Sequence, residues 1–225
     1  MNTVVVIPAL NEAGAIGDLV RRVPAGAVRE IIVVDNGSTD TTAAVAAGAG
    51  ARVVRENRRG YGAACWAGVS AVSAGTDVVA FLDGDGSQSP EELPVILEPI
   101  ARGGADLVLG ARRRIDGHPV HATLGTRLIA RLISWRHGAH VTDIPPFRAI
   151  RIDLLRELEM RDRAFGWPVE MVAKAAARGA RIVEVPVSHR PRVAGRSKVS
   201  GTIVGSFRAG YAFFVIALRT TRGAA

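Results

Sequence analysis

Residues 79–90 read VAFLDGDGSQSP, an apolar run that ends in two aspartates separated by one glycine. Residues 31–35 follow the same pattern, because the run IIVV ends in Asp35. Continuous apolar runs rich in β-branched residues are typical of parallel strands covered by helices on both faces. Ligands bind beyond the carboxyl ends of such strands, so these acidic residues predict a binding site there.

Strand-like and helix-like segments alternate through the first half of the chain. Further apolar runs occur at residues 4–7 and 107–109, and helical patterns occur between the runs, at 12–22, 41–47, 61–72 and 91–101. This alternation predicts an α/β fold with an open, mostly parallel sheet. The second half is less regular, with helices expected at 121–137, 153–158, 169–178 and 203–218, and a strand at 182–187.

Composition narrows the class of protein. The chain has 225 residues, 48% of them hydrophobic, which is enough for one folded domain with a real core. The single cysteine, Cys65, excludes an internal disulfide and indicates a reducing, cytoplasmic location. The N-terminus lacks the basic region of a secretory signal, and the apolar stretch 209–218 is shorter than the ~20 residues that span a bilayer.

The chain is basic, with 29 Lys and Arg against 21 Asp and Glu, and all but Lys174 and Lys198 of the basic residues are Arg. A basic surface attracts nucleotides, anionic lipid or nucleic acid, and compositional bias toward Arg gives the same count. A nucleic-acid-binding protein would need a basic face with aromatic residues, but aromatic residues make up only 5% of the chain. We therefore place that class last.

The turn Asp83-Gly84-Asp85 is the sharpest chemical feature. Two carboxylates on a turn can share a hard divalent cation, and Mg²⁺ or Mn²⁺ keeps coordination positions for substrate phosphates.

The next residues, from Ser89 to Glu92, predict a capping box that starts a helix. Other polar residues at strand ends have simpler explanations, since Asn11 is also a good helix cap. Gly60 and Gly62 match a dinucleotide fingerprint only in part, which disfavours an NAD site.

Four segments occur in a familiar order: VVVIPALNE (4–12), VVDNGSTDTT (33–42), RGYGAACWAG (59–68) and FLDGDGSQSP (81–90). Together they resemble family 2 glycosyltransferases, which have the GT-A nucleotide-sugar-binding fold. The later segments GARRR (110–114), TDIPPFRAIR (142–151) and GRSKVSG (195–201) resemble the polyprenyl-phosphate sugar synthases of the dolichyl-phosphate mannosyltransferase-like branch. The resemblance implies a GT-A domain over residues 1–201, followed by an amphipathic helix and tail at 202–225.

The resemblance also implies roles for individual residues. The nucleotide sugar would be held by Pro8, Ala9, Asn11, Glu12, Asp35, Ser38, Gly60, Gly62, Asp83, Gly84, Asp85, Arg112, Arg196 and Lys198. Asp83, Asp85 and Ser87 would bind Mg²⁺ or Mn²⁺, although relatives have Gln where Ser87 stands. Arg112, Arg127 and Arg148 would contact an acceptor phosphate, and the alternative for each is a solvated surface charge.

The implied reaction is an inverting transfer from a UDP- or GDP-sugar, in which Asp85 is catalytic through the metal. A phosphate acceptor is already ionised near pH 7, whereas a soluble or glycan hydroxyl acceptor needs a general base. Asp143 is the first candidate base and Glu170 the second. Each has a structural alternative, because Asp143 could cap a turn and Glu170 could pair with a cation. A sugar nucleotidyltransferase is disfavoured, because the loop PALNEAG (8–14) lacks Arg and Lys.

The expected C-terminal helix carries an apolar stripe of Ile203, Phe207, Tyr211, Phe214 and Leu218. Arg208 and Arg219 beside it could meet anionic headgroups, so the pattern predicts peripheral attachment to the cytoplasmic face of a membrane. The alternative is that the stripe packs on its own domain or on a second subunit of a homo-oligomer.

Overall fold

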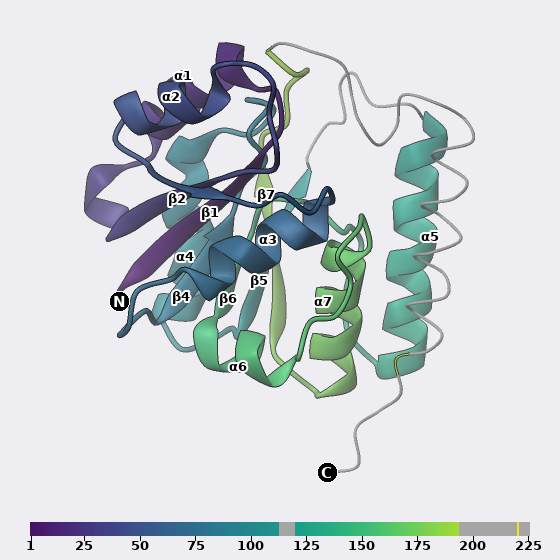
Figure 1. Cartoon of the computed structure of the whole chain (residues 1–225). Coiled ribbons are helices and arrows are strands. Elements are labelled where there is room, and N and C mark those ends of the chain that lie inside the picture. Colours follow the sequence, from purple (N-terminus) through teal and green to yellow (C-terminus); the bar gives the residue numbers. More distant parts are fainter. Residues whose placement is uncertain (113–119, 194–219, 221–225) are drawn as a thin grey trace.

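The structure is a computed structural model that describes residues 1–112, 120–193 and 220. Its centre is a seven-stranded sheet with the strand order β3-β2-β1-β4-β6-β5-β7 (Figure 1). The strands are β1 (Thr3–Ala9), β2 (Glu30–Asp35), β3 (Arg52–Arg55), β4 (Val78–Phe81), β5 (Leu107–Arg112), β6 (Arg148–Arg151) and β7 (Ile182–Val187). Strand β6 is antiparallel to both of its neighbours, and the remaining pairs are parallel.

Helices cover both faces of the sheet (Figure 1). The α-helices are α1 (Ala13–Arg22), α2 (Thr42–Gly48), α3 (Tyr61–Ser70), α4 (Leu93–Ala101), α5 (Val120–His137), α6 (Ile152–Glu157) and α7 (Trp167–Ala177). Two short 3₁₀ turns, η1 (Ala25–Ala27) and η2 (Pro90–Glu92), precede β2 and α4. The predicted α/β fold class, with helices on both faces of a mostly parallel sheet, is confirmed.

The strands at the centre of the sheet show why the apolar runs fold in this way. Successive side chains of a strand point to opposite faces. In β1, Val4 and Val6 therefore join the core on the side of α3 and α7, while Val5 and Ile7 join the core beneath α1 and α4. All seven residues of β1 are buried, which explains why the strand reads as an unbroken apolar run.

Two strands have no counterpart in the sequence prediction. Strand β3 is a short edge strand with exposed Arg52 and Arg55 at its ends, so it lacks a continuous apolar run. Strand β6 lies just after Pro145-Pro146 and inserts antiparallel between β4 and β5. Its pairing partners are far away in sequence, and local periodicity carries no information about them.

The predicted capping box at Ser89 does not form. Ser89 makes no side-chain capping hydrogen bond, and η2 begins there instead of a regular α-helix. The Glu92 carboxylate accepts hydrogen bonds from the backbone N–H (2.9 Å) and hydroxyl (2.9 Å) of Ser188. Glu92 therefore ties the end of β7 to the segment after β4, which is a long-range contact that the sequence does not indicate.

Several predictions lie outside the described residues: the loop with Arg196 and Lys198, the whole GRSKVSG motif, and the apolar helix expected over 203–218. Within the described part of the chain, no helix is long and apolar enough to cross a membrane. The division into a domain at 1–201 and a tail at 202–225 stays a prediction.

Candidate active site

The predicted site residues follow the carboxyl ends of neighbouring strands. Ala9 at the end of β1 pairs in register with Asp35 at the end of β2, and β4 ends two residues before Asp83. Pro8 and Ala9 are buried in β1, and Gly84 packs directly on them, since a Cβ at Gly84 would lie 3.2 Å from the Pro8 carbonyl oxygen. The two strand-end aspartates predicted from the sequence therefore lie at one edge of the sheet.

The loops after β1 and β2 hold each other in place. Asn11, with a left-handed φ of 53°, donates its backbone N–H to the Ser38 hydroxyl at 3.0 Å. The Asn11 side-chain oxygen accepts the N–H of Thr39 at 2.8 Å, so it does not cap helix α1. Asp35 accepts the N–H of Ser38 at 2.9 Å and thereby fixes the second loop. Asn11 and Ser38 thus fix the two loops relative to each other through contacts within the protein.

Asp83 and Asp85 form an electrostatically strained pair. Burial, then the charge of Asp85, raise the pKa of Asp83 to about 7, although the Tyr61 hydroxyl, Arg148 and Arg192 oppose this change. Asp83 Oδ1 is buried and makes no hydrogen bond within the described residues. Asp85 Oδ1 accepts the N–H of Ser87 at 2.9 Å, and Ser87 itself is buried. Two adjacent carboxylates with an unsatisfied oxygen are what a cation would stabilise.

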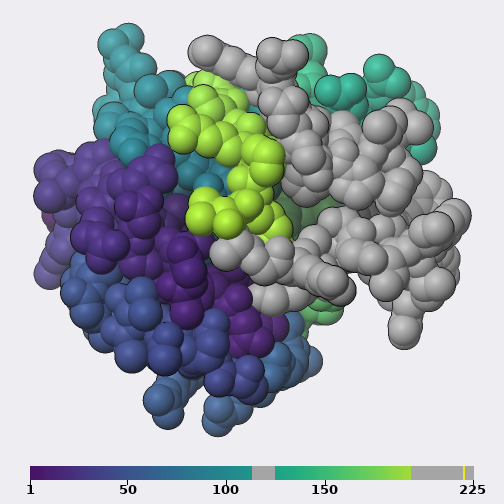
Figure 2. Space-filling model, turned by 90° about the horizontal axis from the view of Figure 1, so that it is seen from above, coloured from purple at the N-terminus to yellow at the C-terminus, as the bar shows by residue number. Residues whose placement is uncertain are grey.

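Arg192, a residue to which the sequence assigned no role, reaches this pair from the other end of the chain. Its Nη2 donates to Glu12 Oε1 at 2.6 Å and lies 3.7 Å from Asp85 Oδ2. The segment that carries it follows β7 and is held by two backbone contacts, Arg190 N–H to Ser87 O and Val193 N–H to Asp85 O. Seen from above, this yellow-green segment lies between the purple N-terminal part and the teal part (Figure 2). The sequence signal was the HRPR run at 189–192.

Arg112 and Asp143 form a second charged pair at the end of β5. Arg112 Nε and Nη2 donate to the two carboxylate oxygens of Asp143 at 2.8 and 2.7 Å, and both side chains are about nine-tenths buried. Burial opposes ionisation of Asp143, but the two-point pairing with Arg112 outweighs it and holds the pKa of Asp143 below its usual value. Glu184 on β7 accepts the Asp143 N–H at 3.0 Å. From the sequence, Arg112 was expected to contact a phosphate and Asp143 to act as a base, whereas in the structure the two side chains form one ion pair.

Arg148 lies in a different environment from the other two arginines predicted to contact an acceptor phosphate. It is fully buried in β6, where its guanidinium lies 5.2 Å from the centre of the Phe81 ring and Nη1 donates to the Pro145 carbonyl. Arg127 is exposed on α5. A residue with no exposed surface does not support the predicted contact with an acceptor, and we assign Arg148 instead to compensating the charge of Asp83, whose pKa it lowers.

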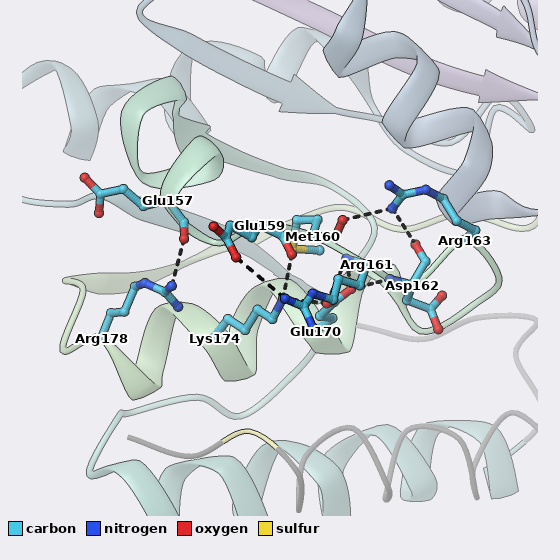
Figure 3. Close-up of polar contacts among 9 residues, drawn as sticks. All are labelled: Glu157, Glu159, Met160, Arg161, Asp162, Arg163, Glu170, Lys174 and Arg178. Carbon is cyan, nitrogen blue, oxygen red and sulfur yellow. Dashed lines mark hydrogen bonds and ion pairs between the residues drawn. The ribbon is translucent and has the colours of Figure 1, made fainter. Parts of the chain in front are cut away.

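Glu170 on α7 is occupied by structural contacts, which Figure 3 shows. Its carboxylate accepts the N–H of Arg161 at 2.9 Å and of Asp162 at 2.7 Å, and it pairs with Lys174 at 2.7 Å. Only 5% of Glu170 is exposed. This geometry favours the structural alternative raised from the sequence, a salt-bridge partner, and it does not support a role as general base.

Gly60 and Gly62 are explained by the loop that Glu170 organises. A Cβ at Gly62 would lie 2.4 Å from the Asp162 carbonyl oxygen, and one at Gly60 would lie 2.1 Å from that of Arg163. The N–H of Gly62 donates to Ala164 O at 2.6 Å, and that of Gly60 donates to the Asn36 side chain at 2.8 Å. The two glycines let the 160–166 loop seat on the start of α3, and their N–H groups are bound within the protein rather than turned to a phosphate.

A divalent cation fits the donor set of this site. Asp83 and Asp85 supply hard oxygen ligands, and the buried, unbonded Oδ1 of Asp83 is the position that a cation would satisfy. Among the described residues, no group of three or more acidic, His or Cys side chains gathers around one point. Substrate phosphates and water would therefore complete the coordination, as Mg²⁺ sites with one or two carboxylates commonly require.

Comparisons with known proteins agree with this arrangement. The model of glycosyl transferase family 2 matches residues 4–159, the part of the chain that carries β1 to β6 and the acidic turn. The chain belongs to this family. Its structure is similar to that of glucosyl-3-phosphoglycerate synthase from Mycobacterium tuberculosis in complex with Mn²⁺, UDP and product, with a TM-score of 0.77 and 26% identity over 96% of this chain and 78% of that one. The fold is GT-A.

Curated relatives point in the same direction. An uncharacterised glycosyltransferase of Mycobacterium tuberculosis is 45% identical over 204 residues, covering 90% of this chain and 91% of that protein. The undecaprenyl-phosphate mannosyltransferase of Micrococcus luteus is 34% identical, covering 91% of this chain and 90% of its own length. The predicted family is confirmed. The relatives that this chain resembles include members of the polyprenyl-phosphate branch.

Proposed function

We propose that this glycosyltransferase moves a sugar, with inversion, from a nucleotide diphosphate sugar to a polyprenyl phosphate. The observation that carries the proposal is an acidic cation site, Asp83 and Asp85 after β4, together with the Arg112–Asp143 ion pair at the end of β5, with β6 lying between the two strands. The names of the Micrococcus luteus relative and of a dolichyl-phosphate hexose transferase from Haloferax volcanii support the lipid acceptor. The Mn²⁺ and UDP in the similar solved structure support the donor.

The chain's own residues would act on the donor as follows. Asp35, buried at the end of β2, and Glu12 would orient the nucleoside, while Arg192 provides a cation between Glu12 and Asp85. Asp83 and Asp85 would hold Mg²⁺ or Mn²⁺, which when bound stabilises charge on the departing diphosphate. As the family resemblance implies, Arg196 and Lys198 would contact the diphosphate; both residues lie outside the part of the chain that the structure describes.

The state of Asp143 favours a phosphate over a hydroxyl acceptor. A hydroxyl nucleophile needs a base whose pKa lies near the working pH. The Arg112 guanidinium engages both Asp143 oxygens and keeps the pKa of that carboxyl low, which makes Asp143 a weak base. A phosphate monoester, with a second pKa of about 6, is ionised already and needs a cationic contact more than a base. Arg112, with Arg127 as a second candidate, would give that contact.

The proposal includes the location of the reaction. A water-soluble donor and a lipid acceptor meet at a membrane surface, so we place the protein at the cytoplasmic face of the membrane as a peripheral protein. The net charge of +8 suits an anionic surface. A homo-oligomer stays a prediction.

Sugar transfer with matched acceptors tests the proposal. UDP- and GDP-sugars are incubated with Mn²⁺ or Mg²⁺ and with a short-chain polyprenyl phosphate, the corresponding polyprenol, or 3-phosphoglycerate, the class of acceptor that the solved relative's name indicates. We expect transfer to the polyprenyl phosphate and none to the polyprenol. Preferred transfer to 3-phosphoglycerate or to a glycan hydroxyl would establish the soluble-acceptor alternative instead.

The variant Asp85→Asn tests the cation site. It should lower transfer by at least 100-fold and abolish the rise in thermal stability that Mn²⁺ with nucleoside diphosphate gives. Asp153→Asn is the matched control, because that carboxylate is 85% exposed on α6. Full transfer by Asp85→Asn in the presence of a chelator would contradict the proposal.

A further inference from the structure

Helix α5 has a buried face that packs on its own domain and an exposed face on the opposite side. Buried residues Ile129, Ala130 and Ile133 lie on the inner side, where α5 packs on α7. At 3.6 residues per turn, Leu128, Arg131 and Trp135 lie on the opposite side within one strip. We call these three residues, with Arg127 and Arg136 at the two edges of the strip, the outer face of α5.

The outer face of α5 combines large apolar side chains with positive charge. Trp135 is 82% exposed and Leu128 is 61% exposed, which places both among the three most exposed large hydrophobic side chains of the described residues. Arg127, Arg131 and Arg136 are exposed as well. The sequence of α5, VHATLGTRLIARLISWRH, contains no acidic residue. An ordinary solvated helix face mixes charges of both signs and rarely exposes a Trp to this extent.

We propose that the outer face of α5 docks on the surface of an anionic lipid bilayer. Amphipathic helices that lie in a membrane interface pair basic residues with Trp and Leu, because the indole sits at headgroup depth while arginines reach lipid phosphates. The arginines here flank the apolar residues on the same strip, an arrangement that suits headgroups. Helix α5 contains no acidic residue to offset these arginines, and a face that is basic throughout complements the negative charge of an anionic bilayer.

The position of α5 connects this surface to the site. The helix begins eight residues after Arg112, and its C-terminal turn is tied to the segment that carries Asp143. Ser134 makes two hydrogen bonds there, accepting from Val141 N at 3.1 Å and donating to Val141 O at 2.9 Å. Docking through α5 would hold the Arg112–Asp143 pair in a fixed relation to the bilayer. The value of this relation for catalysis rests on the proposed lipid acceptor, whereas the docking itself does not.

Vesicle binding of the full-length protein tests the inference. Vesicles of phosphatidylglycerol mixed with phosphatidylcholine are compared with pure phosphatidylcholine, by co-sedimentation and by quenching of Trp fluorescence with lipids brominated near the headgroup. The double variant Leu128→Ser/Trp135→Ser should lose at least tenfold in vesicle affinity, and Arg131→Gln about fivefold on anionic vesicles only. Trp135→Phe should retain binding but lose most of the quenching. Val95→Ser, on α4 with 45% exposure, is the control and should bind as wild type.

Two results would overturn the inference. One is that the double variant binds anionic vesicles with wild-type affinity and that brominated lipids do not quench Trp135 in the wild-type protein. The other is a wild-type dimer in light scattering that the double variant converts to monomer, because a second copy would then cover the face. Transfer to a short-chain, water-soluble polyprenyl phosphate is measured in parallel and should be unchanged in the double variant. If neither the wild-type protein nor any variant transfers sugar, but vesicle binding weakens in the double variant as expected, the proposed function is refuted and the docking surface is supported.

Discussion

Replacing Glu170 separates a structural role from a chemical one. Its carboxylate is buried, accepts the N–H groups of Arg161 and Asp162, and pairs with Lys174, whose side chain is only 20% exposed. Glu170→Ala removes all of these contacts together. The Arg161 and Asp162 donors lose their acceptor, and Lys174 keeps its hydrogen bond to the Glu159 carbonyl but no longer has a carboxylate.

The expected loss follows from these contacts. Removing one partner of a buried ion pair costs about 3–5 kcal/mol, because the remaining charge is left uncompensated. For a chain of this size each kcal/mol shifts the midpoint of thermal unfolding by ~2–4 °C, so Glu170→Ala should unfold roughly 6–20 °C below wild type. Glu170→Gln retains an acceptor oxygen and loses the charge, and we expect a smaller loss of about 1.5–3 kcal/mol.

The assay is thermal unfolding followed by circular dichroism, with sugar transfer measured well below the lowest midpoint. Glu159→Gln is the matched control, since its carboxylate is 73% exposed and lies 3.8 Å from Arg161. Exposed pairs of this kind contribute about 0–1 kcal/mol, so the control should unfold with wild type. Unchanged unfolding of Glu170→Ala together with a fall in transfer of more than 100-fold would refute the structural role and restore Glu170 as a base.

Two further predictions concern the residues around the site. Gly62→Ala should lower the unfolding midpoint by several degrees, because its Cβ would lie 2.4 Å from a backbone oxygen that cannot easily move, whereas Gly48→Ala on α2, with open space around it, should not destabilise. Arg112→Met should make the protein less resistant to acid. The folded pKa of Asp143 lies below its unfolded value, so its contribution is full above about pH 3.9 and is lost as the pH falls through the folded pKa. Without Arg112 that contribution disappears, and the acid-unfolding transition should move to higher pH; an unmoved transition would show that the pair contributes no net stability.

The sequence was most informative where a structural unit is local. The buried strands β1, β2 and β4 and their following acidic residues lie in continuous segments, so an apolar run and the polar residues after it predict both strand and site. Strand β6 was not predicted. It has only four residues and follows two prolines, so its hydrophobic pattern does not differ from that of a loop, and its partners β4 and β5 come from distant segments.

The roles of single residues were harder to predict, because they depend on contacts across the fold. Arg192 and Glu12 are 180 positions apart and meet at 2.6 Å, which spacing along the chain cannot show. Gly60 and Gly62 have the sequence of a ligand-binding loop, but the 160–166 loop occupies that space. For Glu170 the sequence left a base and a salt-bridge partner open, and its burial favours the salt-bridge partner. For Arg148 the family resemblance implied a phosphate contact, which its full burial does not support.

The insertion of β6 into the middle of the sheet has a consequence for synthesis of the chain. Strands β1, β2 and β4 can pair as soon as they emerge from the ribosome, but the other edge of β4 receives its partner only when Arg148–Arg151 is made. At translation rates of ~5–20 residues per second, that edge waits on the order of 3–13 seconds. Residues Val78–Phe81, fully buried in the finished protein, are during that interval an open apolar strand edge that invites pairing with another nascent chain. Expression at lower temperature or with a chaperone that shields apolar segments should therefore raise the soluble yield.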